Sequence, residues 1–259
     1  MRSHDALRER IAQDGFVRLP RLLADDRRRA ALHALDEVFA READIADVRR
    51  WHTEAYRVAY MLPAKHRVFL KLWDQPDLMA LAASVLGDDF VLAGFNGMSM
   101  NPHGAGQPLH RDHPVTTAGV TLYLNVVCAL DEFTVANGAT RVVAGSHRVD
   151  TPDALRITPD ERAALEAAAE PVTVPAGDAV VFDATIWHAA SANTTAAPRR
   201  ALHLFFCRRW VQPHWDFPGS LPADWAAELS AEQRSVLGFG NSAARYDHEQ
   251  RRAFGYGWG

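Results

Sequence analysis

Apolar positions recur at helical spacing over much of the first third of the chain. Residues 5–14 and the stretch from Asp25 to about Ala40 carry apolar side chains every three to four positions, which is typical of amphipathic helices. Between them, GFVRLPRLL has the pattern of a strand that Pro20 ends or kinks. A second helical region is predicted from roughly Ala64 to Leu86, where leucines and phenylalanine form an apolar stripe.

The pattern changes after Gly87. Short segments rich in β-branched and aromatic residues follow, such as GVTLYLNVVCAL and RRALHLFFCRRW, and Gly, Pro, Asn and Asp separate them. Many short strands with this punctuation predict an antiparallel sandwich or barrel. One helix interrupts the series, because Thr158 is a good cap and Pro159 suits the first helical position.

These patterns predict one domain over residues 1–259. We expect residues 1–87 to be mostly helical support, 88–212 to form the β core, and 213–259 to wrap it with loops and short helices. No repeat or low-complexity linker divides the chain, and sandwiches of this length are often single domains. A chain of 259 residues can bury a large core without disulfides.

Composition narrows the partners. The net charge of −4 gives no reason to expect nucleic acid or an anionic membrane as a partner. The two cysteines, Cys128 and Cys207, sit in apolar runs, so buried free thiols and a reducing cytoplasm are expected. MRSHDALRER lacks an apolar signal core, and no apolar run reaches the length of about 18 residues that a membrane span needs. We expect a cytoplasmic monomer or homodimer that binds a small molecule.

Candidate chemistry is concentrated in QPLHRDHPV, residues 107–115. If this stretch is a strand, His110 and Asp112 face one side, and Arg111 and His113 face the other. A His-x-Asp pair supplies two of the three ligands of a 2-His-1-carboxylate iron site, which leaves open positions on the metal.

His188 is the favoured third ligand. It ends the strongly β segment VVFDATIWH, so we expect it at a strand end that opens into a cavity. Arg199 and Arg200 open the next strand, and an arginine fork suits a dicarboxylate. Each feature alone is more often structural, but their order within a β-rich region is more specific. The other candidate ligands are His103, His147 and His203.

The chain resembles the phytanoyl-CoA dioxygenase-like (PhyH) family of Fe(II)- and 2-oxoglutarate-dependent oxygenases. The resemblance is carried by LHRD, by LDEFTVANGATRVVAGSH and by PAGDAVVFDATIWHAASANTTAAPRRALHLFF. It implies a double-stranded β-helix, or jelly roll, with flanking helices, and it implies Fe(II), 2-oxoglutarate and O2 as cofactor and co-substrates.

The resemblance also implies residue roles. His110, Asp112 and His188 match the iron ligands, and Arg199 matches the residue that binds the distal carboxylate of 2-oxoglutarate. A shift of register by one residue would give that role to Arg200. Because halogenating relatives replace the carboxylate ligand with a small residue, the aspartate implies hydroxylation, or a related desaturation, epoxidation or cyclisation.

Further side chains are candidates for the pocket, although packing alone also explains each of them. Tyr123 and Asn125 alternate on one strand face, and His203 shares strand parity with Arg199. The candidates for cofactor contact are Met98 and Asn125, and those for substrate contact are Tyr123, His113, His203 and Trp51.

The expected activity is oxidation of a C–H bond in a small metabolite, with release of succinate and CO2. Analogy with bacterial relatives suggests a natural-product intermediate as the substrate. Two alternatives remain from the residues. One is a non-catalytic jelly-roll binding protein, and the other is a zinc hydrolase that uses the same three ligands.

Overall fold

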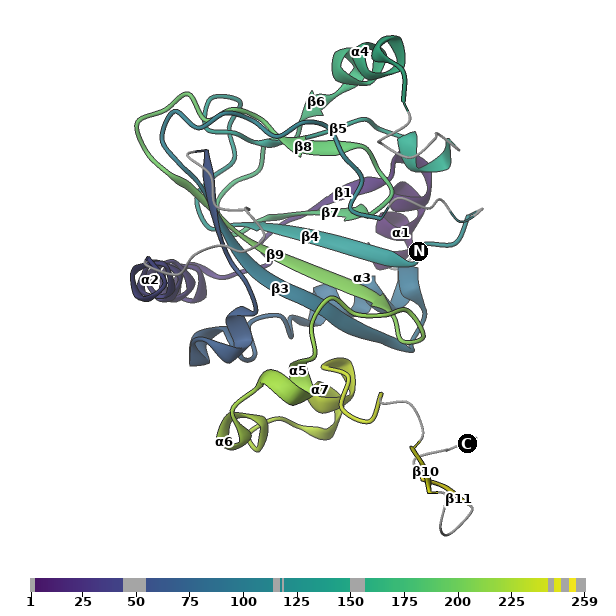
Figure 1. Cartoon of the computed structure of the whole chain (residues 1–259). Coiled ribbons are helices and arrows are strands. Elements are labelled where there is room, and N and C mark those ends of the chain that lie inside the picture. The colour runs from purple at the N-terminus through teal and green to yellow at the C-terminus, as the bar shows by residue number, and fades with distance from the viewer. Residues whose placement is uncertain are drawn as a thin grey trace.

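Two antiparallel sheets form the centre of the molecule (Figure 1). The computed structural model describes residues 3–43, 55–113, 117, 119–149, 157–241, 245–247 and 252–254. The large sheet has the order β1 (Phe16–Leu19), β7 (Ala179–Asp183), β4 (Tyr123–Ala129), β9 (Arg199–Arg208), β3 (Phe90–Met100) and β2 (Tyr56–Ala59). The small sheet has the order β6 (Glu170–Pro171), β5 (Thr140–Val142) and β8 (His188–Ala190).

Neighbours in the large sheet come from distant parts of the chain, as in a jelly roll. β9 lies between β3 and β4, and β7 lies between β4 and β1. All of the strand pairs in both sheets are antiparallel within the described residues. The expected fold class, a mainly β jelly roll with flanking helices, is therefore confirmed.

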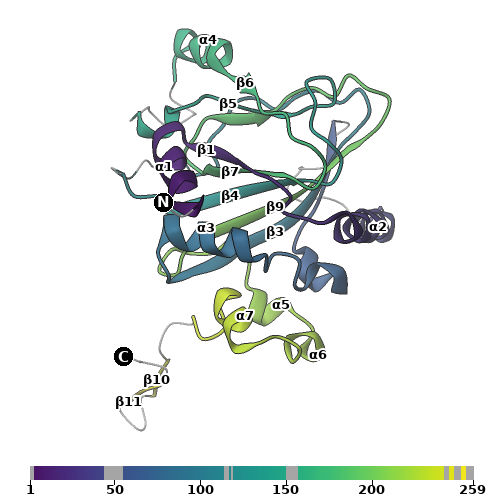
Figure 2. The same cartoon turned by 180° about the vertical axis from the view of Figure 1, so that it is seen from behind.

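Helices cover one face of the large sheet, as the rear view shows for α3 (Figure 2). The helices predicted near the N-terminus are present as α1 (Ser3–Asp14) and α2 (Asp25–Arg41). The apolar stripe of α2 is buried, because its residues at helical spacing all face the same core. These residues are Ala31, Ala34, Leu35, Val38 and Phe39.

The prediction of one helical region from about Ala64 to Leu86 is wrong in its first half. Between Ala64 and Leu86 the only α-helix is α3 (Pro76–Leu86), and two short 3-10 turns, η1 (Leu62–Ala64) and η2 (Arg67–Phe69), precede it. Pro76 lacks a backbone N–H and disfavours helical geometry in the preceding residue, and Gln75 is extended with φ −101° and ψ 127°. The proline therefore starts a helix at this point and cannot continue one.

The N-terminal region also contributes two strands. β1 pairs with β7, as the pattern of GFVRLPRLL predicted, and β2 pairs with β3 at the opposite edge of the sheet. β2 was not predicted from the sequence. The first 87 residues thus complete both edges of the sheet that holds the site.

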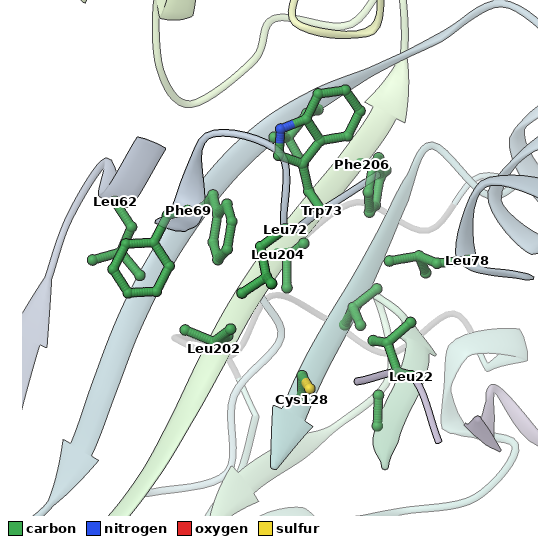
Figure 3. Packing of buried hydrophobic residues seen from close by; sticks show 14 of the residues in the cluster. Leu22, Leu62, Phe69, Leu72, Trp73, Leu78, Cys128, Leu202, Leu204 and Phe206 are labelled. Carbon is green, nitrogen blue, oxygen red and sulfur yellow. The ribbon is translucent and has the colours of Figure 1, made fainter. Parts of the chain in front are cut away.

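Alternation along β9 separates the core from the inner face of the sheet. Leu202, Leu204 and Phe206 point to the helical side, where Phe69 and Trp73 pack among the same buried residues (Figure 3). The intervening positions face the space between the two sheets. The same strand therefore holds the apolar core on one side and functional candidates on the other.

Short helices follow β9. These are α5 (Phe217–Ser220), α6 (Ala223–Ala226) and α7 (Ala231–Val236), which lie below β3 in the view of Figure 1. Phe217, Leu221 and Leu237 belong to the same buried core as the helical side of the large sheet. The predicted interrupting helix is α4 (Pro159–Ala168), with a complete capping box between Thr158 and Glu161. The remaining elements are η3 (Ser146–Arg148) and a hairpin of β10 (Arg245–Asp247) and β11 (Arg252–Phe254).

A search of the described helices for a stretch with the length and hydropathy of a membrane span found none.

Truncation of Phe206 tests the core. The Phe206→Ala variant should lower the free energy of unfolding by about 3–5 kcal/mol, because a fully buried ring leaves a cavity. Val135→Ala is the control, since Val135 is 65% exposed and its loss should change stability by less than about 0.5 kcal/mol. Urea denaturation measures both, and similar values for the two variants would contradict this account of the core.

Candidate active site

Two backbone hydrogen bonds join the segments that carry the histidine candidates. The His110 N–H donates to the His188 carbonyl at 2.9 Å, and the His188 N–H donates to the His110 carbonyl at 3.0 Å. Residues paired in this way project their side chains to the same side. The two imidazoles accordingly lie with ring centroids 4.4 Å apart.

The local structure differs from the prediction at both histidines. HRD is not a strand, since His110 forms an isolated bridge and Arg111 and Asp112 lie in a loop. His188 begins β8 and does not end the preceding strand. The reason is a turn after Asp183, whose carboxylate accepts hydrogen bonds from the Thr185 N–H and hydroxyl at 2.8 and 2.6 Å.

His110 and Asp112 nevertheless project to the same side, and Arg111 projects to the other, as the sequence predicted. Asp112 Oδ1 lies 3.4 Å from His110 Nε2, and Asp112 Oδ2 lies 3.5 Å from His188 Nε2. Arg111 is turned the other way, where it donates to the Ser146 carbonyl at 3.0 Å and lies over the Trp187 ring. One ligand atom from each of the three residues lies within 4.8 Å of the others, a spacing that could hold a metal ion.

The hydrogen bonds of the rings leave the right atoms for a metal. His110 Nδ1 lies 2.9 Å from the Pro108 carbonyl, and His188 Nδ1 lies 3.1 Å from the Ile186 carbonyl. A carbonyl oxygen only accepts, so in the neutral rings Nδ1 carries the proton and Nε2 carries the lone pair. Both Nε2 atoms are the ones that face Asp112, which suits metal ligation.

The carboxylate is held in its ionised form. Burial raises the pKa of Asp112, but the charge of His188 and the hydrogen bonds that both rings donate through Nε2 when they are protonated outweigh it and hold the pKa well below its usual value. For His110, burial lowers the pKa, whereas the hydrogen bond and charge of Asp112 outweigh burial and raise it. The cluster therefore attracts positive charge, and a divalent cation would compete with a proton for it.

Asn125 fixes the orientation of the carboxylate. Its side-chain N–H donates to Asp112 Oδ2 at 2.5 Å. The Asn125 side-chain oxygen is buried and has no hydrogen-bond partner in the described part of the chain. Asn125 is thus placed both to orient a metal ligand and to meet a bound molecule.

The three residues line a cavity of about 350 Å³ between the sheets, and Arg199 lines the same cavity. Arg199 is only 1% exposed, its Nε has no partner among the described residues, and its guanidinium lies 4.4 Å from the centroid of the Phe133 ring. Burial lowers the pKa of Arg199 to about 10, while Asp131 acts in the opposite direction. The side chain stays charged near neutrality, and a buried cation of this kind is stabilised by an anion.

Arg200 points away from the cavity. Its Nε and Nη2 donate to the Asp131 carboxylate at 2.9 and 3.1 Å, and its Nη1 lies 2.6 Å from Asp36. Its charge is therefore neutralised on the other face of β9. The alternative that Arg200 binds a dicarboxylate is not supported, because strand alternation and two aspartates turn it away.

The remaining candidates divide into three groups. Met98 and His203 line the cavity. Tyr123 and His113 do not line it; their rings are tilted against each other with centroids 5.2 Å apart, and the Tyr123 hydroxyl donates to the Gln212 carbonyl. Trp51 lies outside the described residues. His147 is also away from the cavity, where Nε2 lies 3.1 Å from the Ala12 carbonyl.

Sequence reasoning missed an aromatic wall of the cavity. Phe205, His214 and Trp215 come together over Gly94, where an added Cβ would lie 3.0 to 3.5 Å from all three rings. The Trp215 indole N–H donates to Asn96 Oδ1 at 3.1 Å. Parity with Met98 on β3 could have found Asn96, but His214 and Trp215 lie in an irregular segment that has no such signal.

Comparison with known proteins identifies relatives. The family model of phytanoyl-CoA dioxygenase (PhyH) matches residues 11–201. Dioxygenase af480 of Aspergillus fumigatus is 27% identical over 240 residues, which cover 88% of this chain and 74% of that protein. The Mycobacterium tuberculosis protein Rv1501, described as uncharacterized, is 30% identical over 179 residues. That match covers 66% of this chain and 63% of Rv1501, so it spans less than two thirds of the relative.

Solved structures share the fold. SnoN, described as a non-heme alpha ketoglutarate dependent epimerase from nogalamycin biosynthesis, has a TM-score of 0.66 and 21% identity, covering 80% of this chain and 84% of SnoN. HygX from Streptomyces hygroscopicus, solved with nickel, 2-oxoglutarate and hygromycin B, has a TM-score of 0.66 and 15% identity, covering 82% of this chain and 89% of HygX. At these identities the likeness concerns the fold.

Fe(II), 2-oxoglutarate and O2 are the cofactor and co-substrates of the matched family. The cofactor and co-substrates that were expected from the sequence are therefore confirmed as those of the family to which the chain belongs.

The contact between Asn125 and Asp112 can be tested by metal binding. Asn125→Leu should weaken Ni(II) binding by about 10- to 100-fold, because the aspartate loses the donor that orients it. Isothermal titration calorimetry measures the affinity, and Asn241→Ala, at an exposed and distant asparagine, should leave it unchanged. An unchanged affinity in a folded Asn125→Leu protein would show that the carboxylate needs no such support.

Proposed function

Because the chain belongs to the phytanoyl-CoA dioxygenase family, we propose that it is an Fe(II)- and 2-oxoglutarate-dependent oxygenase. It would oxidise a C–H bond of a small metabolite and release succinate and CO2. One observation carries this proposal: a His-Asp-His cluster shares its cavity with a buried arginine that has no ion pair among the described residues.

The residues divide the task between the two ends of the cavity. His110, Asp112 and His188 would hold Fe(II) and leave open positions on the metal. Arg199 would bind the distal carboxylate of 2-oxoglutarate, which supplies the anion that its buried charge lacks. Bound iron, with 2-oxoglutarate and O2, supplies the oxidising chemistry, and the protein orients the reactants and limits access of water.

Hydroxylation is the type of oxidation that we propose. Asp112 offers a carboxylate at the position where halogenating members of the family have a small residue, so this carboxylate would occupy the place on the metal that chloride needs. Desaturation, epoxidation and cyclisation start from the same ligand set, and the position of the substrate decides among them.

The cavity favours an uncharged substrate. Asp112 and Arg199 are the only acidic and guanidinium side chains among the described residues that line it, and both are assigned above. A charged substrate group would therefore lie in the cavity without a partner, which is costly. Tyr60, Phe205 and Trp215 offer aromatic surface instead, so an apolar or amphipathic metabolite fits best. Natural-product biosynthesis, as in the description of SnoN, is the setting we propose.

The buried arginine and the oriented ligand set each disfavour one of the two alternatives. A zinc hydrolase with the same ligands has no need of a buried cation in the same cavity. A binding protein without turnover has no need of a complete ligand set with oriented Nε2 atoms.

Loss of His188 tests the oxygenase assignment. Anaerobic Fe(II) and 2-oxoglutarate should give the wild-type protein a weak visible charge-transfer band, and air should then lead to succinate. His188→Ala should abolish both, since it removes a metal ligand. His33→Ala is the control, because the His33 side chain is 79% exposed on α2. A wild-type protein with neither band nor succinate, over a panel of neutral metabolites, would contradict the proposal.

The two neighbouring arginines provide a matched pair. Arg199→Gln should raise the KM for 2-oxoglutarate by about 100-fold, because a charged and bidentate contact is lost. Arg200→Gln should leave this KM within about twofold, since Arg200 pairs with Asp131 and Asp36 on the other face. Initial rates of succinate formation measure both, and equal effects of the two substitutions would refute the assignment.

A further inference from the structure

His203 occupies a position on β9 that no role has yet explained. It lies four residues after Arg199, and the only residue between them on the same strand face is the small Ala201. Across the sheet it is opposite Asn96 on β3 and Val127 on β4, and all three line the cavity. No large side chain of this strand face therefore separates the imidazole from Arg199.

The next inward-facing position on β9 lies close to the candidate metal ligands. Phe205 on β9 is opposite Asn125 on β4, and Asn125 donates to Asp112. His203 thus stands between Arg199 and the asparagine that orients the carboxylate. A linear diacid that reaches from Arg199 to a metal held by Asp112 and the two histidines passes this imidazole.

The imidazole is also unsatisfied. His203 Nε2 is buried and has no hydrogen-bond partner in the described part of the chain. Arg199 Nε is in the same condition. Two buried nitrogen atoms without partners on one strand face indicate a polar ligand that both of them meet.

We propose that His203 is a positioning residue for the co-substrate, and that its ring N–H donates to the distal carboxylate of 2-oxoglutarate beside Arg199. This inference rests on the proposed function, because it concerns the same cavity and the same 2-oxo acid. It adds a second donor, which selects an acid with a carboxylate at the far end of its chain.

The protonation state of the ring agrees with this role. Burial and the charge of Arg199 lower the pKa of His203 to about 3, with Asp112 acting in the opposite direction and His188 and His110 adding to the decrease. The ring is therefore neutral near pH 7, with one N–H to donate. A neutral donor strengthens the binding of a carboxylate without adding a second positive charge beside the metal.

A pair of acids separates this role from a merely structural one. 2-Oxopentanoate has the same chain length as 2-oxoglutarate but lacks the distal carboxylate. Binding of each acid to the Ni(II)-loaded protein, measured by calorimetry without turnover, reports the contact directly. His203→Leu should weaken 2-oxoglutarate binding by roughly tenfold and change 2-oxopentanoate binding by less than about twofold.

Further variants complete the experiment. His203→Gln keeps an N–H donor and should recover part of the lost affinity for 2-oxoglutarate. His203→Met repeats the test without a donor if leucine disturbs the fold, as judged by circular dichroism. His33→Leu, at an exposed position on α2, should bind both acids as the wild type does.

The outcomes distinguish this inference from the proposed function. Equal weakening of both acids by His203→Leu and His203→Met would overturn it, and so would unchanged binding of 2-oxoglutarate. If Arg199→Gln loses affinity while the His203 variants do not, the inference fails and the oxygenase assignment stands. If the metal-loaded wild type does not bind 2-oxoglutarate, the assignment itself fails.

Discussion

The reciprocal hydrogen bonds between the backbones of His110 and His188 are the interaction on which the site depends. They join a loop after β3 to the first residue of β8, and they turn both imidazoles to the same side. Asp112, two residues further along the loop, then meets both Nε2 atoms. The geometry of three potential ligands is therefore set by main-chain pairing between two segments, and side-chain contacts only refine it.

Electrostatics divides the cavity into two ends. The ionised Asp112 attracts cations at one end, and Arg199 holds a buried positive charge at the other. Among the described residues Arg199 has no direct ion pair, and a buried cation of this kind reduces stability unless a ligand offsets it. The other face of the same strand belongs to the apolar core, so the rigidity of β9 comes from Leu202, Leu204 and Phe206. One face of β9 therefore contributes apolar packing that stabilises the fold, and the other face carries a buried charge that is suited to binding.

The sequence predicted those features that depend on local pattern. The pattern of short apolar segments predicted an antiparallel sandwich or barrel, and the family resemblance implied the jelly roll. The order of His110, Asp112 and a distant strand-end histidine led to the cluster that the structure brings together. Polar turns and prolines caused the errors, since Asp183 ends β7 early and Pro76 breaks the second helical region. The sequence favoured Arg199 over Arg200 only by its match to the family, and the ion pair between Arg200 and Asp131, which hydropathy does not reveal, adds structural support to that proposal.

The aromatic wall over Gly94 lies on a different stretch of the chain from the ligands. The match to the family ends at residue 201, whereas Phe205, His214 and Trp215 come after it. These three residues therefore line the cavity from segments that carry none of the potential metal ligands. A side chain at Gly94 would press first on the Phe205 ring, so the shape of this aromatic wall is coupled to the bare backbone of β3.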